Sequence, residues 1–226
     1  MGEERRLLAV VGPHIQGLII AALETACRRG ELLALQWADM NLDRKELTVR
    51  AETAKDGDRR VLPISPRLAA VLEMAKTDPA GKEYKPEDYV FGKLGRKVEN
   101  VKRAWETAVL KAHGHAPKWQ KGTLAPASRA ALQEIDLHFH DLRHEGASRM
   151  LEAGWPLHHI QHMLGHASLE QTSAYLNVEK TGLQDSMRRF GVPAGIRCNA
   201  VAISTAEGAE TRVEVSTKAA AKELVN

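Results

Sequence analysis

The chain has 226 residues, 43% hydrophobic and 27% charged, which suffices for one large or two small domains with a buried core. Because 32 Lys and Arg stand against 29 Asp and Glu, the formal net charge is only +3, so partner choice has to rest on local patches. The longest apolar run, 17–23, is too short to cross a bilayer, the first residues lack a signal-peptide pattern, and the two cysteines form neither a zinc motif nor a disulfide framework. We therefore expect a cytoplasmic protein with no membrane partner.

Helical spacing of apolar residues begins at Pro13, a residue that suits the first turn of a helix. The pattern predicts an amphipathic helix over 13–27, in which Cys27 belongs to the core. Gly30 marks a break before a second, short helix that ends at Leu35. Further along, Ser65 is a suitable N-cap with a proline after it, which predicts a helix through Ala75.

Two runs rich in β-branched residues, 46–50 and 59–64, flank a segment that contains Asp56-Gly57. This arrangement predicts a β-hairpin. Residues 89–91 are a candidate third strand of the same sheet.

The second half of the chain is mainly helical. Periodic apolar residues predict helices over 98–112, 141–153, 156–164, 168–177 and 179–190. Residues 113–128 lack a clear period and predict a long loop. The tryptophans Trp37, Trp105 and Trp155 are expected in the core, whereas Trp119 in the loop is placed to touch DNA or a partner.

After Gly191 the composition changes, and four basic residues balance four acidic ones, so this segment has no electrostatic case for DNA. We divide the chain into residues 1–190, a mostly α domain with a small antiparallel β-sheet (α+β), and residues 191–226, a tail or arm that is either disordered or exchanged between subunits.

The most informative motif is His140-Asp141-Leu142-Arg143, followed by Leu164-Gly165-His166 and by Tyr175. Residues three apart share a helix face, so His140 and Arg143 can point at one phosphate. Arg and His donors suit the charge that develops on a phosphodiester during substitution at phosphorus. A phenol can then act as the nucleophile.

These boxes, together with the upstream run from Thr25 to Asp39, resemble the signature of the tyrosine recombinases, also called phage-type integrases. The resemblance extends from about Thr25 to Tyr175. It implies the catalytic-domain fold of that family and site-specific DNA recombination, integration or excision, through a 3′-phosphotyrosyl intermediate. No metal, ATP or other cofactor is needed.

The resemblance also assigns roles. It makes Tyr175 the nucleophile, Lys55 the general acid, and His140 the residue that assists proton transfer. The phosphate oxygens would be held by three side chains: Arg28, Arg143 and His166. Glu31 and His144 would support the site. Arg29 competes with Arg28 for its role, and alignment with the family box favours Arg28.

Sequence also offers candidates for contact with the phosphates of double-stranded DNA. They are basic residues of the hairpin, the middle helix and the long loop: Arg59, Arg60, Lys102, Arg103, Lys118 and Lys121. His158 and His162 have a spacing that can hold zinc, but no acidic base lies between them and no cysteine pair supports a site, so we expect a structural role for them.

Some alternatives stay open. A topoisomerase-like enzyme that reseals the strand it cuts, or a catalytically silent DNA-binding regulator, would have the same motifs. Few residues precede Arg28, so we expect a catalytic fragment or a single-domain member without the family's DNA-clamping domain. The family works as tetramers on paired DNA sites, which implies the same assembly here, with a monomer in isolation and a nucleoid location. Phe139 and Glu145 depart from the family pattern without removing a catalytic group.

Overall fold

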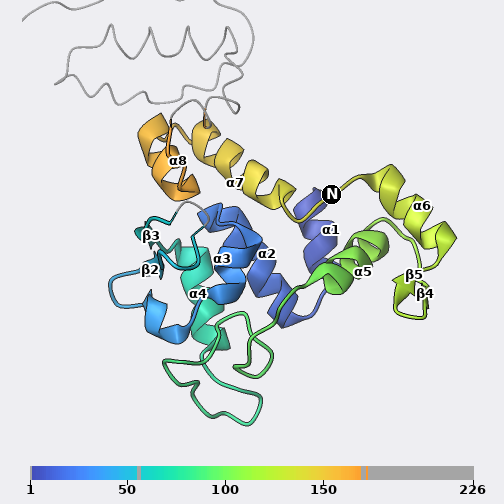
Figure 1. Ribbon diagram of the computed structural model, residues 1–226, viewed down its shortest axis with the longest axis horizontal. Helices are drawn as coiled ribbons and strands as arrows, with labels where there is room; N and C mark the ends of the chain where they lie inside the picture. Colours follow the sequence, from blue (N-terminus) through green and yellow to red (C-terminus); the bar gives the residue numbers. More distant parts are fainter. Residues whose placement is uncertain (1, 55–56, 169–171, 173–226) are drawn as a thin grey trace, which may run out of the picture. The chain divides into compact units, whose positions relative to one another are not determined.

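The computed structural model of the chain describes residues 2–54, 57–168 and 172 (Figure 1). As predicted, they form a mostly helical fold with small antiparallel sheets. The helices are α1 (Glu3–Val10), α2 (Pro13–Thr25), α3 (Arg29–Ala34), the 3₁₀ helix η1 (Trp37–Asp39), α4 (Pro66–Ala75), α5 (Lys102–Ala112), α6 (Pro126–Ile135), α7 (Asp141–Glu152) and α8 (Leu157–Leu164). The strands are β1 (Met40–Asn41), β2 (Glu46–Val49), β3 (Arg60–Pro63), β4 (Trp119–Gln120) and β5 (Thr123–Leu124).

Helix α2 is the centre of the core. Its residues from Gly17 to Leu23 are buried on every side, because α3, α4 and α7 all pack against it. Helix α5 packs between α1 and α6, and α8 packs on α7 (Figure 1). A helix that is apolar all round is expected in such a central position.

The chain between α2 and α3 turns at Ala26, which adopts a left-handed conformation with φ of 52°. The Thr25 hydroxyl donates to the Ala21 carbonyl (2.6 Å) and accepts from the Cys27 backbone N–H (3.2 Å), which satisfies polar groups at the helix end. The prediction that Gly30 marks the break was therefore wrong, since Gly30 lies in the first turn of α3. The break comes earlier and brings Arg28 to the start of α3.

The predicted hairpin is confirmed, with β2 and β3 antiparallel and Leu47 opposite Leu62. The predicted third strand at 89–91 was wrong, because β1 occupies that edge of β2. Val90 and Phe91 instead belong to the loop between α4 and α5 and are buried, and the Val90 N–H donates to the Leu35 carbonyl (3.0 Å). The apolar character of this run reflects burial rather than strand pairing.

The Ser65 cap is confirmed: its hydroxyl accepts from the Leu68 N–H (3.1 Å) and α4 spans the predicted residues. Helix α5 begins at Lys102, four residues later than predicted. The side-chain oxygen of Asn100 accepts a hydrogen bond from the Lys102 N–H (3.3 Å). The predicted loop 113–128 is wrong in part, since it contains the β4–β5 hairpin and the first turn of α6.

Helices α7 and α8 lie where the sequence predicted them. The helix predicted at 179–190 and Cys198 lie outside the described residues, as does the helix predicted at 168–177 except for residues 168 and 172.

Gly146 sets the distance between α7 and α2. A β-carbon at this position would come within 2.4 Å of the Leu23 carbonyl oxygen. The missing side chain thus lets α7 approach the backbone of α2 closely.

Trp105 is buried, as predicted, with its ring at an edge-to-face distance of 5.2 Å from Phe139. Trp37 is half-buried against the core. The prediction for Trp155 was wrong: the side chain follows the turn at Gly154 and is 37% exposed. Among the described helices, none has the length and apolar character needed to traverse a membrane.

Candidate active site

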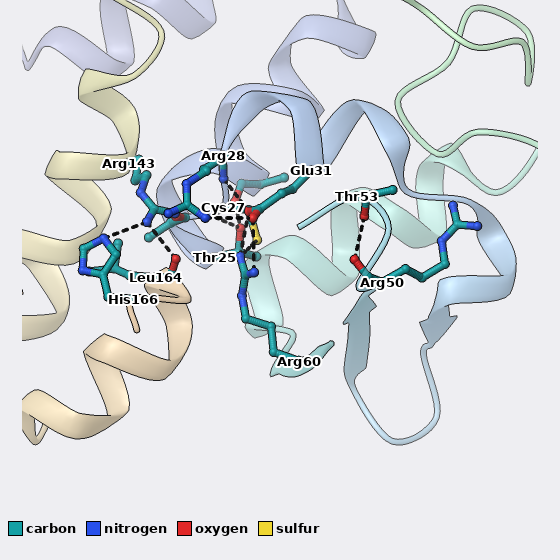
Figure 2. Close-up of polar contacts among 12 residues, drawn as sticks. Thr25, Cys27, Arg28, Glu31, Arg50, Thr53, Arg60, Arg143, Leu164 and His166 are labelled. Atoms are coloured by element: carbon teal, nitrogen blue, oxygen red, sulfur yellow. Dashed lines mark hydrogen bonds and ion pairs between the residues drawn. The ribbon is translucent and has the colours of Figure 1, made fainter. Parts of the chain in front are cut away.

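Arg143 joins three segments that are far apart in the sequence (Figure 2). The side chain leaves the first turn of α7 and is 3% exposed. Its Nη1 donates to the Ala26 carbonyl at the end of α2 (2.7 Å), and its Nη2 donates to the Leu164 carbonyl at the end of α8 (2.7 Å). The same Nη2 lies 3.0 Å from Nε2 of His166. The guanidinium is therefore held in place by backbone groups.

His166 is fixed by the turn that ends α8. Gly165 adopts the left-handed conformation (φ 63°), and Gln161 accepts from the His166 N–H and donates to its carbonyl (3.2 and 3.0 Å). The ring Nδ1 lies 3.0 Å from the Thr172 hydroxyl. The His166 ring is thus held between the Arg143 guanidinium and the Thr172 hydroxyl.

Arg28 is the N-cap of α3 and contacts Glu31 twice. Its backbone N–H donates to Glu31 Oε2 (2.8 Å) and its Nη1 lies 3.3 Å from Oε1. The Arg28 side chain is 20% exposed, whereas Glu31 is 2% exposed. Arg29, the rival candidate, is exposed and belongs to the lining of a neighbouring pocket.

Glu31 also holds Arg60, with Nη2 at 2.7 Å from Oε2 and Nη1 at 3.2 Å from Oε1 (Figure 2). The Arg60 side chain is 5% exposed and both arms of its fork are paired with the Glu31 carboxylate, so the expectation that it presents its charge to DNA phosphates does not fit its position. Nη2 of Arg60 also lies 3.8 Å from the Cys27 thiol. Burial raises the pKa of this thiol, which keeps it protonated and inert.

His140 and His144 lie on the solvent side of α7, with ring centres 4.8 Å apart in an edge-to-face arrangement. Partial loss of water around the His140 ring, the neighbouring His144, and the positive charges of Arg143 and Arg28 together lower its pKa below the ordinary 6.5. His140 is therefore neutral at neutral pH. His140 is the N-cap of α7, one helical turn before Arg143.

Two of the expected catalytic residues, Lys55 and Tyr175, lie outside the described residues. The neighbours of Lys55 in sequence line a pocket of about 300 Å³ beside His166, to which Ala54, Arg59 and His158 contribute. The four described candidates Arg28, His140, Arg143 and His166 thus gather at one place, formed by the ends of α2 and α8 and the starts of α3 and α7.

The other expected DNA contacts are exposed: Arg59, Lys102, Arg103, Lys118 and Lys121. Arg103 lies over the ring of Trp119, 4.6 Å from its centre, so this tryptophan packs against a cation. Lys102 is 3.9 Å from Glu106.

Within residues 2–54, 57–168 and 172, no three His, Cys, Asp or Glu side chains come together as a metal site. His162 contacts the Val61 carbonyl through Nε2 (3.1 Å), which joins α8 to β3. His158 and His159 pack ring against ring, with centres 4.3 Å apart.

A family model described as "Phage integrase family" matches residues 4–181. The chain belongs to the phage integrase family. The "Shufflon-specific DNA recombinase" of Escherichia coli is 30% identical to this phage integrase family member over 177 residues, which are 78% of this chain and 36% of the recombinase. This chain spans 36% to 59% of the length of the first three curated relatives that it matches.

Solved structures of integrases share the fold. The catalytic domain of bacteriophage HP1 integrase is 23% identical with a TM-score of 0.54, and the alignment covers 82% of this chain and 90% of that domain. The Tn1549 transposon integrase in complex with transposon right end DNA is 15% identical with a TM-score of 0.59, covering 84% of this chain and 64% of the other. The described helices and sheets are thus those of an integrase catalytic domain.

Two features of this site were not predicted from the sequence: the contact between the Thr172 hydroxyl and the His166 ring, and the inward orientation of the Arg60 side chain. A signal for the second was present. Side chains alternate along a strand, so Arg60 shares a face with the buried Leu62, while Val61 points outward and is 38% exposed.

Proposed function

We propose that the protein is a site-specific recombinase that cleaves and rejoins double-stranded DNA through a 3′-phosphotyrosyl intermediate. The observation that carries this proposal is the arrangement around Arg143, whose guanidinium is held by two backbone carbonyls and lies 3.0 Å from the His166 ring. Donors held in advance at the position of an anion stabilise developing charge without reorganisation during the reaction.

In the proposed reaction the Tyr175 oxygen attacks the scissile phosphorus, and the bond from phosphorus to the 5′-oxygen breaks. Arg28, Arg143 and His166 hold the non-bridging oxygens, and Arg suits this task because its fork stays charged at every relevant pH. Lys55 gives a proton to the departing 5′-oxygen. A second 5′-hydroxyl then attacks the phosphotyrosine, which restores Tyr175 and joins the new strand, so no ATP or metal is consumed.

His140 takes the proton of the Tyr175 hydroxyl in this scheme. A phenol has a reference pKa of about 10 and needs a base or nearby positive charge to attack near neutral pH. The environment of His140 lowers its pKa, so the imidazole is neutral and able to accept a proton at neutral pH. His144, one turn further on, supports the His140 ring by direct contact.

The wider organisation is also proposed. Residues 1–190 form the catalytic domain and residues 191–226 an arm that docks on a neighbouring subunit. The protein acts as a homotetramer on paired DNA sites in the cytoplasm, at the nucleoid. The resemblance to the Tn1549 integrase, a structure that contains transposon right end DNA, supports DNA as the partner. Arg59, Lys102, Arg103, Lys118 and Lys121 are the proposed phosphate contacts.

The decisive experiment is a covalent trap. The full chain is incubated with a labelled pool of duplexes of randomised sequence, each nicked in one strand so that the fragment released by cleavage diffuses away. We expect a protein–DNA adduct that survives denaturation and chelator, and that Tyr175→Phe abolishes. Tyr84→Phe, a control at a tyrosine that stacks on Trp37, leaves the adduct unchanged.

Sequencing the trapped duplexes identifies the site for later assays. An adduct that persists in Tyr175→Phe would contradict the proposed nucleophile. Relaxation of supercoiled DNA that carries paired copies of the site, without any recombinant product, would identify a topoisomerase-like enzyme. DNA binding without an adduct would identify a silent regulator.

A further inference from the structure

We propose that Arg60 is a positioning residue for the strand-cleavage reaction: it holds Arg28 through Glu31 and packs against the turn that carries His166, and it makes no contact with DNA. This inference rests on the proposed function. It concerns a residue whose charge and place beside Arg59 on the hairpin suggest a phosphate contact, but whose contacts in the structure all face inward.

The first observation is the sharing of one carboxylate by two arginines. Glu31 is 2% exposed and receives both arms of the Arg60 fork, at 2.7 and 3.2 Å. The same two oxygens receive the backbone N–H and Nη1 of Arg28, at 2.8 and 3.3 Å. Arg60 therefore takes the shorter side-chain contact, and it fixes the carboxylate on which both the backbone and the guanidinium of Arg28 rest.

The second observation is the contact with Gly165. A β-carbon at Gly165 would lie 2.8 Å from Arg60 Nη1 and 3.2 Å from Nε. The Arg60 guanidinium thus lies directly against the backbone of the residue before His166. It is packed between α3 and the end of α8, the two segments that supply Arg28 and His166.

The third observation is how little of Arg60 is available to a ligand. Its side chain is 5% exposed, and Nε is buried with no hydrogen-bond partner among the described residues. Low exposure is shared with Arg143, but the Arg143 guanidinium bonds to two neutral carbonyls, whereas both arms of the Arg60 fork bond to a carboxylate that neutralises its charge. Orientation by a buried neighbour that is itself hydrogen-bonded is how supporting residues tune the groups that touch a substrate.

Removal of the Arg60 head group should change the site in a defined way. The buried Glu31 carboxylate would keep Arg28 as its nearest cation and would draw the Arg28 guanidinium toward itself. The space beside Gly165 would also open, so the turn before His166 would lose its support. Both effects misplace donors of the phosphate clamp, whereas the affinity for DNA should stay the same.

The test compares Arg60→Met with Arg59→Met, two neighbouring arginines of which one is buried and the other exposed. The DNA is a nicked duplex recovered from the wild-type trap. The single-turnover rate of adduct formation is measured at saturating DNA, and the affinity is measured over a range of salt concentrations. Thermal unfolding checks that both variants are folded.

For Arg60→Met we expect cleavage about 10- to 100-fold slower than wild type, with unchanged affinity and unchanged salt dependence. For Arg59→Met, a change in a proposed phosphate contact, we expect weaker binding and a salt slope reduced by about one. A reduced salt slope for Arg60→Met, or a wild-type cleavage rate in folded Arg60→Met, would overturn the proposal.

A substrate with sulfur at the bridging 5′ position distinguishes two roles for Arg60: support of the phosphate clamp and support of the general acid. Its thiolate leaves without a proton, so it bypasses a defect in a general acid such as Lys55. We expect Arg60→Met to stay slow on this substrate, because its defect lies in the phosphate clamp. Full recovery would mean that Arg60 acts through the hairpin that carries Lys55, and would overturn the assignment to Arg28 and His166.

If Arg60→Met does not fold, Arg60→Lys serves instead, since it keeps the charge and one hydrogen bond to Glu31 while losing the fork. We expect cleavage slower by about 10-fold, again with unchanged salt slope. A wild-type rate in this variant would count against a positioning fork. A wild-type protein that forms no adduct would refute the recombinase function itself, an outcome distinct from all of these.

Discussion

Glu31 and Glu4 each bind two arginines, and these two carboxylates differ in burial. Glu31 binds Arg28 and Arg60 within the active site and is 2% exposed. Glu4 of α1 binds Arg67 of α4 (2.5 Å) and Arg149 of α7 (2.7 Å) at the surface, and is 20% exposed. Both arrangements join distant segments with the same chemical groups.

Burial changes the energetics of the same carboxylate–arginine cluster. At Glu4 the two arginines are 41% and 40% exposed, so water and salt screen the attraction and each partner can be solvated alone. At Glu31 the loss of either partner leaves a charge in an apolar interior, where solvation cannot replace it. The surface cluster adds a little stability, whereas the buried cluster constrains the geometry of the site.

The largest expected effect is that of Glu31→Ala. This substitution leaves Arg60 buried without its carboxylate and removes the acceptor of the Arg28 N–H. We expect the free energy of unfolding to fall by about 3–5 kcal/mol. Urea denaturation followed by circular dichroism measures the change.

The matched control replaces both charges with apolar side chains of similar length, as Glu31→Met with Arg60→Met. Because neither member of the buried Glu31–Arg60 pair then carries a charge, stability should recover to a large part, while the adduct assay stays impaired. If Glu31→Ala cost no more than a surface substitution, the contrast between the two clusters would disappear.

A much smaller effect is expected for Glu4→Ala, which breaks the surface cluster. Double-mutant cycles on exposed ion pairs give energies of about 0.2–1 kcal/mol, and we expect a loss within that range. The loss should shrink in high salt, because the screening length falls to about 3 Å at 1 M ionic strength. Urea denaturation at low and high salt tests this, and a loss that is large and independent of salt would place Glu4 in the same class as Glu31.

The smallest effect is the pH dependence of Glu4. Burial alone would raise the pKa of its carboxyl, but hydrogen bonds from Arg149 and Arg67 outweigh burial and hold the pKa below the ordinary 4.5. A depressed pKa contributes stability above 4.5 that is lost as the pH falls through the folded-state pKa. The difference in melting temperature between wild type and Glu4→Gln should therefore be largest near neutral pH and shrink as the pH falls below 4.5. A difference that stays constant over this range would rule out the linkage.

Much of the fold could be predicted from periodicity and caps. Helix α4, which begins after Ser65, and helix α8, which ends at Gly165, each have a cap residue and an apolar stripe. Both lie where they were predicted. Helices α1 and α6 were not predicted; each is short and has a single buried residue, Leu7 in α1 and Ser128 in α6. Residues 89–91 were predicted as a strand because a strand and a buried loop segment select the same apolar side chains.

The candidate site could be predicted only as far as its residue types and their order. Sequence proximity and family boxes select Arg143 and His166, but not the carbonyls of Ala26 and Leu164 that hold the guanidinium, since any residue offers a carbonyl. Arg60 was misjudged because charge was weighed before strand alternation. Strand alternation turns the Arg60 side chain inward, where the buried Glu31 carboxylate pairs with it.

The close contact between α7 and α2 at Gly146 also determines where Arg143 lies. One helical turn separates Gly146 from Arg143, and a single methyl group there would meet the Leu23 carbonyl and push the two helices apart. The reach of Arg143 to Ala26 would then change although nothing near DNA had been altered. Laboratory evolution of this protein should therefore leave Gly146 unchanged. Gains in rate should be sought at residues that do not alter the spacing of these two helices.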